Sequence, residues 1–209
     1  MARKAQVPGN KRRIPRQARA AETVAAILEA TAQILEAGGL PALTTNAVAV
    51  RAGVSIGTLY QYFDDKNAIL LALARREMTV TLGRLAREAL PAADRSPDDR
   101  VRAAVRAILD AFRGRMRARK AVVQAILARG LAVELMGPVA TFIAGHPSAA
   151  MPNLTREQVF VLSRAMMGTI RAAVMEEQPF LRSAAFEDEL VRLALAYLDV
   201  VTAPSAAAR

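Results

Sequence analysis

The sequence predicts an all-helical protein with a small helix-turn-helix unit near its N-terminus and a larger helical body behind it. Apolar residues recur at helical spacing along most of the 209-residue chain, and no segment alternates like a β-strand. Aromatic residues make up only 4%, while alanine and leucine fill most apolar positions, a mixture that favours helices over strands. Near residue 53, a glycine separates two short segments, each preceded by a hydroxyl residue that can cap a helix.

The N-terminal unit is expected to contain three short helices and to share a fourth with the body. The apolar period of the first helix covers 19–37 and ends at a pair of glycines. The second helix is expected over 45–51, followed by Gly53, and the third over 55–62. An aspartate at position 65 should cap a long fourth helix that runs towards residue 90.

The body is expected to consist of five further helices. They are predicted near 98–114, 116–129, 131–144, 155–177 and 184–202. The domain organisation that follows is a mobile basic arm, a helix-turn-helix domain, a ligand-binding and dimerisation domain, and a disordered tail, over 1–18, 19–66, 67–203 and 204–209.

Composition excludes several classes of site. The chain has no cysteine, so it has neither disulfides nor thiolate zinc ligands, and its single histidine, His146, gives no basis for a metal site. We therefore expect no metal, no cofactor and no enzymatic activity, because no catalytic constellation is present. The opening residues do not look like a signal peptide, and charges interrupt the apolar stretch over 121–145. A soluble, cytoplasmic protein is expected.

Positive charge is concentrated in the first twenty residues. The net charge is +10, and the opening segment holds seven basic residues and no acid. Such an arm is typical of a contact with nucleic acid, although a solvated tail would have the same composition. The basic residues are Arg3, Lys4, Lys11, Arg12, Arg13, Arg16 and Arg19.

Four residues stand where a helix-turn-helix needs them. A small side chain at Ala49 lets the second helix cross closely, and Gly53 accepts a left-handed turn. Val54 and Leu59 should bury the inner face. A helical hairpin without a ligand would show the same spacing, so spacing alone leaves both interpretations open.

The residues of this region resemble the DNA-binding region of the tetracycline-repressor (TetR) family of bacterial regulators. The resemblance extends from Ile27 to Leu70 and includes the run Val48-Ala49-x-x-Ala52-Gly53-Val54-Ser55-x-Gly57-Thr58-Leu59-Tyr60-x-Tyr62-Phe63-x-x-Lys66. It implies about nine helices, of which the first three bind double-stranded operator DNA. It also implies a homodimer built on the last two helices, and a repressor that a small-molecule effector releases.

Carried over position by position, the resemblance implies a set of DNA contacts. Thr45, Lys66 and Tyr60 would bind phosphates, the first two at helix N-termini. Gln61 is the best candidate for direct base reading, because its amide can pair with the major-groove edge of adenine. The other recognition-helix candidates are Ser55, Ile56, Gly57, Thr58 and Tyr62, and Arg12, Arg13, Arg16 and Arg19 would add contacts from the arm.

The helix-turn-helix unit is itself acidic, which is unusual for a surface that approaches DNA. Residues 21–66 carry a net charge of −3, from Arg51 and Lys66 against Glu22, Glu29, Glu36, Asp64 and Asp65. The attraction to phosphates would then depend largely on the arm. A second basic cluster, within 113–120, could add to it but is better interpreted as a solvated face.

The body offers candidate residues for a ligand pocket and for a dimer interface. Met78, Phe112, Met116, Phe142 and Met167 could line a pocket, although core packing is the common role of such residues. A stripe of small residues on the penultimate helix, with apolar residues of the last helix, could pack against a second copy or form ordinary core. These interface candidates are Ala165, Gly168, Ala172, Leu190, Leu193 and Tyr197.

The predicted function is therefore a sequence-specific, homodimeric transcriptional regulator that acts as a repressor and is released from its operator by a small ligand. An activator is the first alternative, and a helical protein-interaction module is the second.

Overall fold

A computed structural model of the chain describes residues 16–89, 96–145 and 154–203. Within these ranges the chain forms nine α-helices and one short 3-10 helix and contains no strand, which confirms the all-helical prediction. The elements are α1 (Arg16–Ala42), α2 (Thr45–Ala52), α3 (Ile56–Tyr60), α4 (Lys66–Ala89), α5 (Pro97–Arg113), α6 (Met116–Leu127), α7 (Ala132–Gly145), α8 (Arg156–Met175), η1 (Pro179–Arg182) and α9 (Ala184–Thr202).

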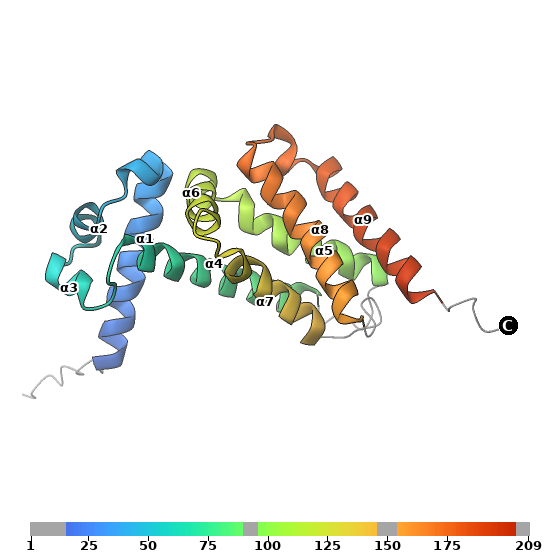
Figure 1. Ribbon diagram of the computed structural model, residues 1–209, viewed down its shortest axis with the longest axis horizontal. Helices are drawn as coiled ribbons and strands as arrows, with labels where there is room; N and C mark the ends of the chain where they lie inside the picture. The colour runs from blue at the N-terminus through green and yellow to red at the C-terminus, as the bar shows by residue number, and fades with distance from the viewer. Residues whose placement is uncertain (1–15, 90–95, 146–153, 204–209) are drawn as a thin grey trace, which may run out of the picture.

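The helices are arranged in two parts along an elongated molecule. Figure 1 shows α1, α2 and α3 at one end and the α8–α9 pair towards the other, with α4 leading from the first part into the second. Helix α4 packs on both α1 and α5, and α5 packs on α9. A further contact joins α1 to α6, so the N-terminal unit is attached to the body at two places. Among the described helices, none is long and apolar enough to cross a membrane.

Side-chain caps fix the helix starts that the sequence predicted. Thr44 accepts the N–H of Ala47 at 3.1 Å to begin α2. The Asp65 carboxylate accepts the N–H groups of Asn67 and Ala68, both at 2.8 Å, at the start of α4. These bonds satisfy backbone donors that have no partner within the first turn of a helix.

Several helix bounds differ from the predicted ones, and those of α1 and α3 concern the N-terminal unit. Helix α1 begins at Arg16, three residues before the expected start, because the alanine-rich opening favours helix. Its regular part ends at Gly39, where φ is 67° and ψ is −165°, and one more helical stretch follows through Pro41. Helix α3 ends at Tyr60, two residues early, and the chain continues through a tight turn.

One hydrophobic core runs through both parts of the molecule. Ile27 and Leu35 of α1, Leu59 of α3 and Ile69 of α4 are all fully buried in it. The predicted inner face of the helix-turn-helix is confirmed at Leu59, and Val54 packs partly buried against the core. Burial of this face determines which side of α3 remains in solvent.

Candidate functional site

The turn between α2 and α3 has the geometry of a helix-turn-helix. Gly53 adopts φ 69° and ψ 29°, and its N–H donates to the Val50 carbonyl at 3.2 Å. The N–H of Val54 donates to the Ala49 carbonyl at 3.0 Å. A β-carbon built at position 53 would meet no atom within 4 Å. Glycine is favoured there by the left-handed backbone alone and not by lack of space.

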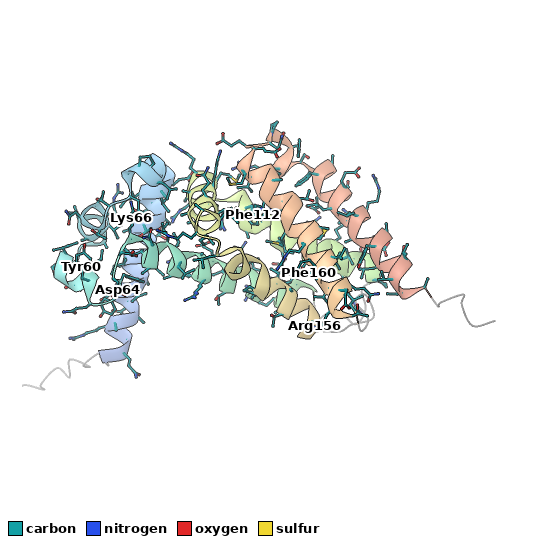
Figure 2. The ribbon with its side chains drawn as sticks, in the orientation of Figure 1. Tyr60, Asp64, Lys66, Phe112, Arg156 and Phe160 are labelled. Carbon is teal, nitrogen blue, oxygen red and sulfur yellow. The ribbon has the colours of Figure 1, made fainter. Side chains whose placement is uncertain are left out.

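Helix α3 and the turn that follows it present an open outer face. Ile56, Gly57 and Tyr60 of the helix and Gln61 and Tyr62 of the turn are all exposed, and Tyr60 is 50% accessible. Figure 2 labels Tyr60 at the end of the molecule that carries α1–α3. The face that the sequence assigned to DNA is therefore not covered by any of the residues that the structure describes.

Ser55 and Thr58 take part in the cap of α3. The Ser55 hydroxyl accepts the N–H of Thr58 at 3.0 Å, and the two side-chain oxygens lie 2.8 Å apart. If either hydroxyl contacts DNA, that contact competes with the hydrogen bonds that the hydroxyl makes in this cap.

The three residues that the resemblance assigned to phosphates lie at helix ends. Thr45 is the first residue of α2, and its Oγ1 lies 3.2 Å from the Tyr60 hydroxyl. Lys66 is the first residue of α4 and is exposed, next to Asp65. Figure 2 places Lys66 and Tyr60 in the same end of the molecule.

The arm is described only in part. Arg12 and Arg13 lie outside the described residues, and the side chain of Arg16 is not described although α1 begins there. Arg19 lies exposed in the first turns of α1.

Two of the acidic residues of the N-terminal unit face the body. Arg115 donates two hydrogen bonds to the Glu29 carboxylate, at 2.6 and 3.1 Å. The Glu36 carboxylate accepts the backbone N–H of Ala118 at 3.0 Å, near the start of α6. The hydrogen bonds from Arg115 and Gln33 lower the pKa of Glu29 from 4.5 to about 2. Part of the acidic excess is thus used in the α1–α6 contact.

The basic cluster within 113–120 is partly solvated, as the sequence suggested, but its side chains also contact neighbouring elements. Besides the Arg115–Glu29 pair, Arg117 donates to the Ala37 carbonyl at 3.1 Å. Arg119 pairs with Glu77 of α4 at 2.8 Å, and Lys120 pairs with Glu177. The cluster joins α6 to its neighbours, and sequence spacing could not show this because the partners are 42 to 86 residues away.

A cavity of about 320 Å³ lies where α1 and the body meet. Of the predicted pocket residues, Met78, Phe112 and Met167 line it. Met116 and Phe142 do not line this cavity and instead pack, partly buried, against the core.

Sequence reasoning missed the charged part of the cavity wall. The charged residues that line it are Glu29, Arg76, Glu77, Arg115, Arg119 and Arg171. One sequence signal was available on α6, where Arg115, Arg119 and Val122 share one helix face at spacings of four and three.

The predicted interface residues divide between surface and core. On α8, Ala172 is exposed and Ala165 and Gly168 are partly exposed; on α9, Leu193 is exposed and Tyr197 partly so. The prediction for Leu190 is corrected, because this side chain is only 2% exposed and fills the core between α9 and its neighbours. The described ranges contain no group of His, Cys, Asp and Glu side chains that could hold a metal ion.

Comparison with known proteins identifies the N-terminal unit. The family described as "Bacterial regulatory proteins, tetR family" matches residues 27–73, which run from the middle of α1 into the first turns of α4. The transcriptional repressor KstR of Mycolicibacterium smegmatis is 47% identical over 51 residues, which are 24% of this chain and 25% of that protein. Residues 27–73 thus form a TetR-family DNA-binding segment.

The body shares the fold of TetR-family structures at low sequence identity. A TetR-family regulator from Streptomyces coelicolor superposes with a TM-score of 0.64 at 22% identity, covering 86% of this chain and 99% of that one. The regulator FadR from Bacillus subtilis, solved with stearoyl-CoA, gives 0.60 at 16% identity over 83% and 98%. The KstR match spans about a quarter of that relative's length, and a match to the regulator BetI of Burkholderia cenocepacia, 35% identical over 86 residues, spans 44% of that protein.

Proposed function

We propose that this chain binds a specific DNA sequence as a homodimer and represses transcription until a small molecule releases it. The observation that carries the proposal is the exposed outer face of α3, held by a capped turn in the segment that matches the family. A helix of this kind reads the major groove with the side chains that it leaves in solvent.

The proposed DNA contacts fall into two groups. Thr45, Tyr60 and Lys66 bind phosphates and fix the orientation of the unit on the duplex. The outer residues of α3, Gln61 first among them, read base edges in the major groove. Arg12, Arg13, Arg16 and Arg19 add attraction from the arm.

The dimer is proposed to form through α8 and α9. Large apolar side chains are exposed on both helices, including Phe160 at 58% on α8 and Val200 at 76% on α9. Leu193 is exposed one heptad before Val200, on the same face of α9. Exposed apolar surface of this kind marks an association site.

The small residues of α8 support the same surface. A β-carbon built at Gly168 would meet no atom within 4 Å, so packing inside the protomer does not require a glycine. Close approach of a second helix would require it. The α8–α9 pair of one protomer and that of its partner would then form a four-helix bundle.

Release by a ligand is supported by the position of the cavity. Its wall includes Glu29 and Ala32 of α1, the helix that carries the recognition unit, together with residues of α4, α5, α6 and α8. An occupant that alters the α1–α6 contact would change the spacing of the two recognition helices away from about 34 Å, one turn of DNA. The stearoyl-CoA bound by FadR shows that a protein of this fold can hold a small molecule.

Repression is favoured over activation because KstR is named a repressor. Band shifts with fragments of the source genome test the proposal, followed by transcription from a bound fragment in vitro. Sequence-selective shifts with reduced transcription are expected. Selective shifts with increased transcription would indicate an activator. The absence of selective binding would leave the protein-interaction alternative.

A further inference from the structure

The cavity combines apolar walls with an excess of positive charge. Leu73, Phe112, Val122 and Met167 contribute apolar surface to it from four helices. The ionisable groups on its wall are four arginines and two glutamates, a net charge of +2. A net positive charge at the edge of an apolar space favours an occupant that carries a negative charge.

The two glutamates are already paired with three of the arginines. Glu29 accepts hydrogen bonds from Arg115, and Arg76 lies 3.8 Å from the same carboxylate. Glu77 pairs with Arg119 at 2.8 Å and lies 3.5 Å from Arg76. Neither carboxylate is free to attract a cationic ligand.

Arg119 is paired with Glu77, but one of its N–H groups has no hydrogen-bond acceptor within the described ranges. Its Nη2 donates to Glu77, but its Nε is buried and has no hydrogen-bond partner among the residues that the structure describes. Burial lowers the pKa of Arg119, an effect that Glu77 opposes. The positive charge of Arg119 is thus only partly compensated at the cavity wall, which this residue helps to form.

Arg171 is the fourth arginine and lines the cavity from α8. No hydrogen bond or ion pair joins its side chain to any residue of the described ranges. Helix α8 packs against α6, so Arg171 and Arg119 belong to neighbouring walls. A guanidinium that faces a cavity without a carboxylate partner is suited to a planar acid group, which it can bind through two parallel hydrogen bonds.

We propose that the cavity takes a small amphipathic organic anion, whose acid group is held by Arg171 beside the positive charge of Arg119 and whose apolar body lies against Leu73, Phe112 and Val122. This inference names the ligand class for the release step and so rests on the proposed function. The volume of about 320 Å³ is at the low end for ligand pockets, which limits the occupant to a compact molecule.

Isothermal titration of the full-length protein with octanoate tests the proposal. Octanol and octylamine have the same hydrocarbon chain, but octanol is neutral and octylamine is cationic. Comparing the three affinities therefore separates the effect of the head-group charge from that of burying the chain. Octanoate is expected to bind and to raise the melting temperature, with the other two at least about tenfold weaker. Equal binding of all three probes, or no binding of octanoate, would overturn the assignment.

Variants of Arg171 locate the acid group. Arg171→Gln should weaken octanoate at least about tenfold and leave octanol unchanged, since it removes a charge-assisted contact. Arg171→Lys should retain part of the affinity. Arg156→Gln is the matched control, because Arg156 is exposed at the other end of α8 and does not line the cavity. Unchanged octanoate affinity in Arg171→Gln would refute the site.

DNA binding is measured in parallel to separate the two proposals. Selective DNA binding without an octanoate response refutes only the ligand class. Octanoate binding without any selective DNA binding refutes the proposed function and leaves the cavity assignment intact.

Discussion

The Oγ1 of Thr45 and the hydroxyl oxygen of Tyr60 lie 3.2 Å apart, joining the first residue of α2 to the last residue of α3. Both side chains are at least partly accessible, and both were assigned to the DNA backbone. One hydroxyl of the pair donates to the other, so one hydrogen remains for a phosphate, from a position that is fixed before the phosphate arrives. Such preorganisation reduces the entropy lost on binding.

Tyr60→Phe should weaken DNA binding without loss of fold. The substitution removes the hydroxyl but keeps the ring, so the expected cost is on the order of 1 kcal/mol in DNA affinity. Binding to a selected fragment is measured by fluorescence anisotropy, with thermal unfolding as the control. The double variant with Thr45→Val should cost less than the sum of the single variants, because the two hydroxyls act together. Wild-type affinity in Tyr60→Phe would remove this pair from the interface.

Gln61→Ala and Tyr62→Ala should each cost on the order of 1–3 kcal/mol in DNA affinity. Both side chains are exposed, so the melting temperature should change little. Gln61→Ala should also relax the base preference at one position of each half-site, which selection from a randomised DNA pool would detect. If both variants bind with full affinity and selectivity, another element reads the DNA.

The Glu29–Arg115 pair should make the α1–α6 contact sensitive to acid. The pKa of Glu29 is lowered from 4.5 to about 2 in the folded chain, mainly by the hydrogen bond from Arg115. Its contribution to stability is therefore complete above pH 4.5 and is lost as the pH falls towards 2. The side chain is 42% exposed, so solvent screening keeps the effect modest.

The test compares the wild type with Glu29→Gln. The wild type should melt at a higher temperature at pH 7, and the gap should narrow when both proteins are melted near pH 3, between the unfolded and folded pKa values of Glu29. Other carboxylates titrate in both proteins and cancel in the difference. A gap that does not change between the two pH values would show that Glu29 does not carry this dependence.

Dimerisation should respond to charge at position 168 more than to size. Gly168→Glu places a carboxylate on the proposed α8 interface and should give monomers or insoluble protein in analytical ultracentrifugation at micromolar concentration. Arg182→Glu is a control with the same introduced side chain on the exposed 3-10 helix. A wild type that sediments as a monomer would contradict the proposed assembly.

The sequence was informative where structure depends on local chemistry. The caps at Thr44, Ser55 and Asp65 and the left-handed glycine at 53 are decided within a few residues, and the structure contains each of them. The apolar period also predicted that α3 would bury Leu59 and expose Gln61.

Sequence reasoning was weaker where contacts span the chain. The arginines of α6 have partners on α1 and α4, and no periodicity links Arg115 to Glu29, 86 residues earlier. Leu190 and Leu193 lie three residues apart on α9, yet one is core and the other surface. The direction in which a helix turns its apolar residues is set by packing, and α9 carries apolar residues on more than one face.

Glu29 and Glu36 are engaged with α6, but these contacts add no positive charge to the side of the molecule that faces DNA. The attraction to DNA phosphates must therefore come from other residues. Arg115, Arg117, Arg119 and Lys120 are all engaged within the chain. The basic residues that precede α1 are the remaining concentrated source, with Arg3, Lys4, Lys11, Arg12 and Arg13 in the first fifteen positions.

Deletion of residues 1–15 should therefore preserve dimerisation and the melting temperature but lower DNA affinity at least about tenfold near physiological salt. Each phosphate contact that is lost flattens the dependence of log affinity on log salt by about 0.9. Two arms per dimer should flatten the slope by several units. A salt titration of the full-length and truncated proteins on one selected fragment measures this, and Arg12→Gln with Arg13→Gln should give an intermediate slope. Equal slopes in all three proteins would mean that the arm does not contact DNA, and that Lys66 and Arg19 supply the attraction instead.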